Sequence, residues 1–215
     1  MRDELLFRIV FFALWIVYIA YLTGKEYYTR EESATRFSIR KHLREASKRE
    51  GKVRIVARAV LTPFWISGFI LYAIYPDWMT FLTIPLPVRL RWVAVGLSIA
   101  TIPLIVWAYR TLGKQWTPPK LLLRKQHTLV TSGPYRYVRH PIYAASFTFM
   151  IALAVATANW LVLLPMIVGT ALLYAQVGRE EAMLIERFGD DYRAYMKRTG
   201  RFLPRFQNLH FRGKS

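Results

Sequence analysis

The sequence has no cysteine in its 215 residues, which excludes disulfides, thiolate metal sites and cysteine nucleophiles. Its histidines are not spaced as paired metal ligands, so we expect no metal; they are His42, His127, His140 and His210. No Gly-x-Gly-x-x-Gly or Walker-type loop supports a soluble nucleotide-binding domain. No Gly-x-Ser-x-Gly motif supports a hydrolase.

Acidic residues are also scarce. The chain has 31 Lys and Arg against 13 Asp and Glu, which gives a net charge of +18, and it has no carboxylate between Asp77 and Glu180. It is nevertheless 54% hydrophobic, and its basic residues lie in loops between apolar runs. This combination is typical of a small polytopic membrane protein. It predicts contact with membrane lipids through anionic headgroups, and no contact with nucleic acid.

Five apolar runs predict an all-α, polytopic membrane helical bundle with about five transmembrane helices. The first run is too long for a typical signal-peptide core and is not followed by a small-x-small cleavage site, so we expect it to be retained. The last two are slightly short, and only two residues separate them, which predicts a tight, tilted helical hairpin. The runs are Leu5–Leu22, Val53–Tyr75, Leu90–Tyr109, Ile142–Thr157 and Trp160–Val177.

Charge placement predicts the orientation of these spans. The segments 25–54, 111–140 and the tail after Gly178 are rich in Lys and Arg, whereas 76–89 and the hairpin tip carry little or no charge. Basic loops stay cytoplasmic, so we expect the N-terminus outside and the C-terminus inside. We expect one integrated domain, in which residues 1–110 hold the N-terminal helices and a basic cytoplasmic loop. Residues 111–215 hold a loop, the hairpin and a tail.

The tail contains a predicted amphipathic helix on the cytoplasmic side. Phe188, Tyr192 and Tyr195 follow one another at helical spacing and form an apolar stripe. Gly189, directly after Phe188, breaks the helix, and Asp190 is a candidate N-cap for the helix that follows.

The most informative segment is Gly133-Pro-Tyr-Arg-Tyr-Val-Arg-His-Pro-Ile-Tyr143. One interpretation is a positively charged flank with interfacial tyrosines. That interpretation does not explain Arg139-His140-Pro141 running directly into a span, and we favour a ligand site. Pro141 fixes the start of the following helix and biases His140 away from helical backbone angles.

Glu180 and Glu181 appear where the fifth predicted span ends, and we expect them to open a new helix. Acids in a first helical turn complement the helix dipole, which is a sufficient structural reason for them. They are also the carboxylates available to a ligand amine beside the basic loop. The sequence leaves both interpretations open.

Together, His127-Thr-Leu-Val130, the segment 133–143, Glu180-Glu181 and Phe188-Gly-Asp-Asp-Tyr192 resemble the isoprenylcysteine carboxyl methyltransferase family. The related phospholipid N-methyltransferases share part of this pattern. The resemblance covers residues 112–204 and implies a membrane helical bundle that binds S-adenosyl-L-methionine in its C-terminal half, on the cytoplasmic side. By motif, the cofactor pocket would be lined by His127, Leu129, Val130, Tyr135, His140, Pro141 and Tyr143, with Glu180 at the charged part of the cofactor.

The same resemblance implies a substrate position about one turn before Glu180. Family members in eukaryotes have a basic residue there, associated with the substrate carboxylate, whereas this chain has Gln176, with Arg179 beside the glutamate. We therefore take Arg179 and Glu180 as catalytic candidates, and Gln176 and Arg179 as substrate-binding candidates.

The activity that this resemblance implies is carboxyl O-methylation of an amphipathic or lipid-linked, prenylcysteine-like acceptor. Phospholipid amine N-methylation is the first alternative. A membrane sterol or isoprenoid reductase using NADPH is the second, because such enzymes share a similar C-terminal pattern. A non-enzymatic lipid-binding or scaffold protein is a third, and it would leave Arg139-His140-Pro141 and Glu180-Glu181 without a task.

Overall fold

The computed structural model describes residues 2–31, 63, 65–74, 77–113 and 128–205, and these residues are helical in their regular parts. The long helices are α1 (Arg2–Glu31), α4 (Val88–Leu112), α5 (Pro141–Thr157) and α6 (Trp160–Arg198). A shorter apolar helix covers Trp65–Ile74, and two short 3-10 helices, η1 (Asp77–Leu82) and η3 (Gly133–Arg136), lie in the connections.

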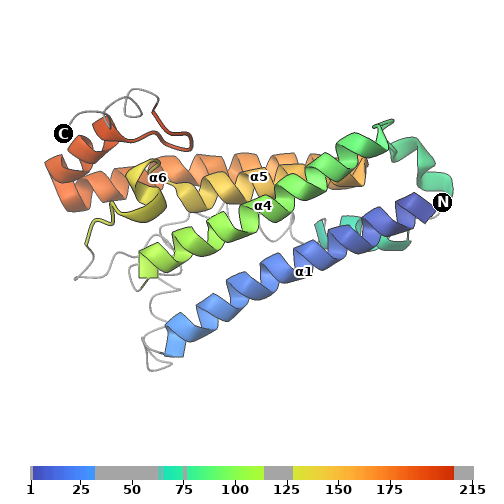
Figure 1. Cartoon of the computed structure of the whole chain (residues 1–215), viewed down its shortest axis with the longest axis horizontal. Coiled ribbons are helices and arrows are strands. Elements are labelled where there is room, and N and C mark those ends of the chain that lie inside the picture. The colour runs from blue at the N-terminus through green and yellow to red at the C-terminus, as the bar shows by residue number, and fades with distance from the viewer. Residues whose placement is uncertain (1, 32–62, 64, 75–76, 114–127, 206–215) are drawn as a thin grey trace, which may run out of the picture.

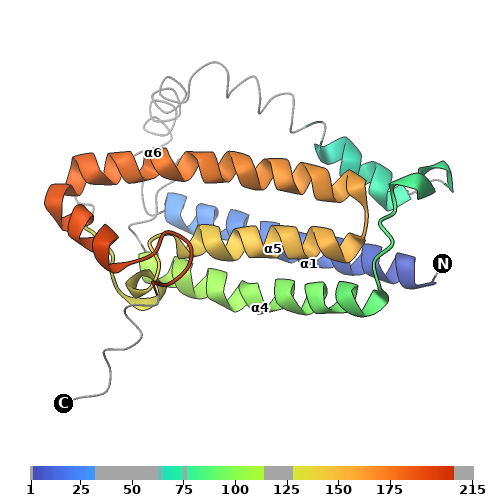
Figure 2. The same ribbon diagram turned by 90° about the horizontal axis from the view of Figure 1, so that it is seen from above.

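Helix α5 lies in the middle of the bundle, between α4 and α6, and α1 packs across it (Figures 1 and 2). Its side chains Phe149, Leu153 and Ala154 are completely buried. From α1, Tyr18 stacks on Phe149 with 4.6 Å between ring centroids, and its hydroxyl donates to Ser146 Oγ at 3.2 Å. Burial of most of its surface explains why α5 is apolar around most of its circumference.

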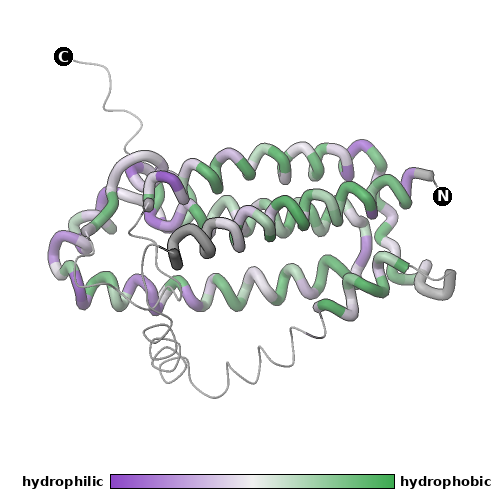
Figure 3. Tube along the Cα trace, turned by 90° about the horizontal axis from the view of Figure 1, so that it is seen from below, coloured by the Kyte–Doolittle hydropathy of each residue, from purple (hydrophilic) through white to green (hydrophobic). Residues whose placement is uncertain are grey.

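Among the residues that the structure describes, the helices α1, α4 and α6 are long and apolar enough to cross a membrane, and they contain the first, third and fifth predicted spans. The fourth predicted span is α5, with 17 residues. The second is described only as Trp65–Ile74, and its start lies outside the described residues. Hydrophobic residues run along most of each helix, and hydrophilic residues gather near the ends (Figure 3). The chain is an integral, multi-pass membrane protein.

The predicted hairpin between the last two apolar runs is confirmed. Ala158 ends α5 in the left-handed conformation, with φ 48° and ψ 42°. Asn159 then caps α6, because its side-chain oxygen accepts a hydrogen bond from the backbone N–H of Leu161 at 2.9 Å. A left-handed residue followed by an asparagine cap reverses the chain within two residues.

The prediction that Glu180 and Glu181 open a new helix is wrong. They lie in the interior of α6, which runs for 39 residues from Trp160 to Arg198. The backbone stays helical through Gly178 and both glutamates, up to Gly189, where φ 55° and ψ −124° produce a kink. The part before this kink, residues 160–188, spans about 43 Å, whereas the hydrocarbon core of a bilayer is about 30 Å thick, so the end of this part extends beyond the membrane.

The two ends of the bundle hold different features. The N-terminus of α1, the start of α4 and the α5–α6 hairpin lie at one end, whereas η3, the start of α5 and the kinked end of α6 lie at the other (Figures 1 and 2). This arrangement matches the alternation that the charge pattern predicts. The assignment of the η3 end to the cytoplasm stays a prediction.

A buried arginine holds the N-terminal end together. Arg91 is 3% exposed, and its Nε donates to the carbonyl oxygen of Ala156 at 2.9 Å. One Nη donates to Glu4 Oε2 at 3.0 Å, and the guanidinium lies 3.7 Å from the centroid of the Phe7 ring. Arg91 therefore links α1 and α4 to the last carbonyls of α5, where a cation is favoured by the helix dipole.

We expect Arg91→Ala to destabilise the protein by about 2 kcal/mol, because buried carbonyl oxygens of α5 lose their donor. The matched control is Arg89→Ala, which removes an exposed arginine two residues earlier on the same helix. Thermal unfolding in detergent measures both. Equal stability of the two variants would show that the Arg91 contacts contribute nothing.

Candidate functional site

The segment 128–143 enters the bundle through an irregular stretch, η3 and then α5. Pro141 is the first residue of α5, and His140 precedes it with φ −125° and ψ 62°, so the expected effect of the proline on the backbone is confirmed. Both residues are buried. The histidine side chain is therefore directed into the protein and away from lipid.

The chain after α6 folds back against this entry. Val138 and Gly200 form an isolated parallel bridge, and the backbone N–H of Arg139 donates to the Gly200 carbonyl at 2.8 Å. The N–H of His140 donates to the Arg201 carbonyl at 3.1 Å. Residues 199–203, which we call the tail clasp, are thereby fixed beside the start of α5.

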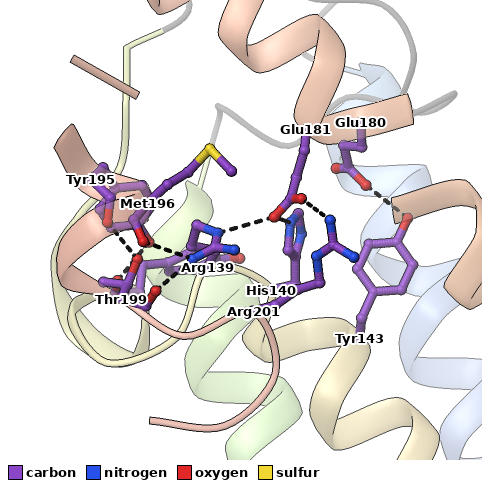
Figure 4. Close-up of polar contacts among 10 residues, drawn as sticks. Arg139, His140, Tyr143, Glu180, Glu181, Tyr195, Met196, Thr199 and Arg201 are labelled. Carbon is purple, nitrogen blue, oxygen red and sulfur yellow. Dashed lines mark hydrogen bonds and ion pairs between the residues drawn. The ribbon is translucent and has the colours of Figure 1, made fainter. Parts of the chain in front are cut away.

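Glu181 is the centre of a buried ion cluster at this point (Figure 4). It is 3% exposed, and its Oε1 accepts from Arg139 Nε at 3.0 Å and lies 3.3 Å from His140 Nε2. Its Oε2 accepts from an Nη of Arg201 in the tail clasp. Helix α6, the entry to α5 and the clasp all meet at this one carboxylate.

The charge of Glu181 is maintained by these partners. Its position beyond the apolar run that ends at Val177 places it outside the spanning part of α6. Burial alone would raise the pKa of Glu181, but hydrogen bonds from His140, Arg201 and Arg139 outweigh this and hold the pKa well below its usual range. Glu181 is therefore ionised at neutral pH and is committed to the fold.

Arg139 is likewise committed to structure. One Nη donates to the carbonyl of Met196 at 3.1 Å and also to the carbonyl of Thr199, at the end of α6. With its Nε on Glu181 and a side chain only 7% exposed, Arg139 has little surface left for a ligand. Within the Arg139-His140-Pro141 motif, Arg139 therefore holds the site together and does not bind a ligand itself.

The neighbouring carboxylate, Glu180, is placed differently. Its Oε2 accepts a hydrogen bond from the Tyr143 hydroxyl at 2.8 Å, and its side chain is half-buried. Figure 4 shows Glu180 directed toward Tyr143 on α5, on the other side of the Glu181 cluster from Arg139. Within the described residues, no Lys, Arg or His side chain forms an ion pair with Glu180, so its carboxylate can bind a positively charged ligand.

Aromatic hydroxyls surround this carboxylate. Burial, followed by the proximity of Tyr109 and Glu180, raises the pKa of Tyr135, which therefore stays protonated at neutral pH.

The carbonyl of Tyr135 accepts from the Tyr195 hydroxyl at 2.6 Å, and burial raises the pKa of Tyr195 to about 12. The predicted stripe residue Tyr195 therefore holds η3 against the kinked end of α6.

The remaining predicted residues take three kinds of position. Leu129 and Val130 are half-buried in the stretch before η3, and Val130 packs on the main hydrophobic core. Gln176 lies one helical turn before Glu180, on the same face of α6. Arg179 is exposed, and His127 lies outside the described residues. These positions leave the binding roles as predictions.

Sequence reasoning missed two members of the site. Glu181 was singled out only as half of an acidic pair, although its spacing of four from buried Val177 places both on one face of α6. Arg201 had no local signal, because its partners are His140, before α5, and Glu181, on α6, and they are brought to it only by the clasp.

The groups around Glu180 suit an organic cation. A half-buried carboxylate and protonated tyrosine rings favour an ammonium or sulfonium by charge and by cation–π contact. This is a fit for S-adenosyl-L-methionine, which carries both groups. A metal finds no comparable donor set, because no group of three His, Asp or Glu side chains within the described residues is arranged to hold one.

Gly200 gives the clasp its shape. A methyl group placed on its Cα would overlap the Leu203 carbonyl oxygen. We expect Gly200→Ala to release the clasp, which would expose residues 199–205 to protease and lower the thermal midpoint, with a cost of about 1–3 kcal/mol. Gly96→Ala is the control, because nothing lies within 4 Å of the added methyl. A clasp as protected as in the wild type would contradict this geometry.

Comparison with known proteins gives matches in the same region. Residues 90–191 match the phospholipid methyltransferase family model. The chain is 31% identical over 127 residues to the cobalt-zinc-cadmium resistance protein CzcN of Cupriavidus metallidurans, a match covering 58% of each protein. It is 36% identical over 81 residues to the protein-S-isoprenylcysteine O-methyltransferase of Schizosaccharomyces pombe, covering 37% of this chain and 34% of that protein.

The fold is similar to a solved structure, that of the eukaryotic intramembrane Ras methyltransferase ICMT (isoprenylcysteine carboxyl methyltransferase). The TM-score is 0.51 at 23% sequence identity, over 71% of this chain and 53% of that chain. The fold therefore defines a class of intramembrane helical proteins. Within that class, residues 90–191 are similar to the phospholipid methyltransferase family, and the isoprenylcysteine O-methyltransferases are among the relatives that the chain resembles. It spans about half the length of curated relatives such as CzcN.

Proposed function

We propose that this protein is a membrane-embedded, S-adenosyl-L-methionine-dependent methyltransferase that methylates a carboxylate on a lipid-linked, prenylcysteine-like acceptor. The observation that carries the proposal is the Glu180–Tyr143 pair, a half-buried carboxylate oriented by a tyrosine hydroxyl at 2.8 Å. It lies at the end of the apolar part of α6, where a water-soluble cofactor and a lipid-borne acceptor can both arrive. The family match over residues 90–191 supports methyl transfer.

Each residue of the site has a separate task in this proposal. Glu180 binds the positively charged part of the cofactor, and Tyr143 orients the carboxylate that does so. Glu181, Arg139 and the tail clasp fix the relative positions of α5 and α6, and thereby the distance between the bound cofactor and the bound acceptor. Leu129, Val130, Tyr135, His140 and Pro141 form the remaining lining, and they exclude water.

The bound cofactor would supply a methyl group on a sulfonium sulfur, and the acceptor oxygen–carbon bond forms as the carbon–sulfur bond breaks, with its electron pair left on sulfur. A carboxylate acceptor is already deprotonated at neutral pH, so the protein needs no general base. The chain then contributes orientation and water exclusion, which account for much of the barrier reduction in such transfers.

One observation favours phospholipid amine N-methylation as a second candidate. The position one turn before Glu180 is Gln176, a neutral side chain, and Arg179 is exposed. On α6 itself, neither of these positions offers a buried cation for an acceptor carboxylate. A neutral amide suits an amine acceptor equally well.

Ligand binding in detergent tests the proposal. We expect calorimetry to detect S-adenosylhomocysteine binding to the purified protein and to detect none with NADPH. Transfer of a labelled methyl group to a panel of prenylcysteines and phosphatidylethanolamine then separates the two acceptors. Binding of NADPH alone would favour the reductase alternative, and binding of neither would favour a scaffold role.

A further inference from the structure

We propose that the tail clasp is the acceptor-binding part of the site, in which Arg201 binds the acceptor carboxylate and Phe202 contacts its apolar chain. This inference rests on the proposed function and deepens it. It assigns the acceptor to residues outside α6, and it replaces the role that the family pattern gives to a basic residue before Glu180.

The side chain of Arg201 is more exposed than that of Arg139, so a ligand can contact it. Both donate to Glu181, but the Arg201 side chain is 37% exposed, against 7% for Arg139. A guanidinium has five N–H donors in a planar fork, which suits it to a carboxylate. The backbone of Arg201 is fixed, because its carbonyl accepts from the His140 N–H at 3.1 Å.

The charges around Glu181 favour an additional anion. One carboxylate faces two guanidinium groups, those of Arg139 and Arg201, which leaves a surplus of one positive charge. The surplus is reachable at Arg201, since Arg139 is buried. Glu180 lies on the other side of the cluster and is matched to a cation, so the site offers opposite charges to two different groups (Figure 4).

An apolar surface continues from Arg201 toward the membrane. The Phe202 ring lies 5.4 Å from Phe147 on α5 and 5.5 Å from Tyr174 on α6, between ring centroids. Tyr174 is 53% exposed. It precedes Glu180 by six residues, about 9 Å along the helix toward the apolar part of α6.

Together these features specify the chemistry of the ligand. A molecule that contacts both Arg201 and the Phe147–Tyr174–Phe202 surface has an anionic end and an apolar chain directed toward the bilayer. An S-prenylated cysteine with a free carboxylate has this form. The cofactor reaches the site from water and has no apolar chain to match the aromatic surface, so we assign this surface to the acceptor.

The test uses N-acetyl-S-farnesylcysteine, its uncharged amide, and the full-length protein in detergent. We expect the S-adenosylhomocysteine-loaded wild type to bind the acid at least tenfold more tightly than the amide. For Arg201→Gln we expect the KM for the acid to rise about tenfold, while the dissociation constant of S-adenosylhomocysteine stays within twofold. Arg201→Lys should lie between. Phe202→Ala should weaken binding of the acid and the amide equally.

Arg193→Gln is the matched control, because this arginine pairs with Asp190 on the exposed surface of α6 and lies outside the site. Three outcomes would overturn the inference. They are an unchanged KM in Arg201→Gln, an equal loss of S-adenosylhomocysteine binding in that variant, which would assign Arg201 to the cofactor, and a loaded wild type that binds neither acid nor amide. In the first, methylation of the acid by the wild type would leave the proposed function standing. In the third, cofactor binding by the wild type would leave methyl transfer standing but remove the prenylcysteine-like acceptor.

Discussion

Glu180→Gln is expected to weaken S-adenosylhomocysteine binding by at least about 30-fold while leaving the thermal midpoint unchanged. The substitution keeps the size of the side chain and removes its charge. A hydrogen bond to a charged group contributes about 1.5–3 kcal/mol, and 2 kcal/mol corresponds to about 30-fold. Because Glu180 is half-buried, and its recorded contact is the Tyr143 hydroxyl, the fold does not depend on its charge. Calorimetry measures the affinity.

The control for this prediction is Glu186→Gln, which removes an exposed glutamate from the same helix. Tyr143→Phe should have a smaller effect than Glu180→Gln, since it removes only the group that orients the carboxylate. Wild-type affinity in Glu180→Gln would exclude Glu180 from the cofactor site. If Glu180→Gln does not fold, Glu180 also stabilises the protein, which would contradict the assignment of the structural role to Glu181 and of cofactor binding to Glu180.

Glu181→Gln is expected to have the opposite profile, with a large loss of stability. Its carboxylate separates two guanidinium groups, and removing the charge leaves Arg139 buried without a counter-ion. Breaking a buried ion pair in this way costs about 3–5 kcal/mol. Thermal unfolding in detergent measures the loss, and limited proteolysis should show the tail clasp released. Since the folded pKa of Glu181 lies below its usual value, this stabilisation is present above about pH 4.3 and is lost as the pH falls further.

A double variant makes the cause of this effect specific. Arg139→Gln combined with Glu181→Gln removes the buried charge together with its partner, so we expect it to cost less than the sum of the two single changes. Additive losses would show that the two side chains act independently. A Glu181→Gln variant as stable as the wild type would show that the ion cluster does not hold the clasp.

Local rules predicted those parts of the fold that depend on neighbouring residues. Pro141 sets the start of α5, and the Ala158–Asn159 pair reverses the chain, because each acts on the backbone within one or two positions. The apolar runs predicted the spans because the hydrocarbon core of the membrane requires length and apolarity alone.

The acidic pair shows why the rest could not be predicted. Acids are common in a first helical turn, so Glu180 and Glu181 indicated a helix start. The helix is instead continuous, and the two carboxylates point about 100° apart around it. Which one faces the ion cluster depends on the rotation of α6 against α5. That rotation is set by packing between residues far apart in the sequence.

The roles of Arg139 and Arg201 could not be predicted from the sequence either, because they also depend on contacts between residues far apart in the chain. Arg139 belongs to a motif that suggests ligand binding, yet its partners Met196 and Thr199 lie 57 and 60 residues later in the sequence and make it structural. Arg201 stands in a basic tail with nothing local to distinguish it. The clasp, which pairs Gly200 and Arg201 with the entry to α5, gives both arginines their roles.

The most direct test of a cofactor site at Glu180 and Tyr143 is a structure of the protein in complex with S-adenosylhomocysteine. We expect the ammonium group of the ligand within hydrogen-bond distance of the Glu180 carboxylate, with the Glu181 cluster intact beside it. A complex in which the nucleoside lies elsewhere, or in which lipid chains fill the space beside Tyr143, would contradict this account.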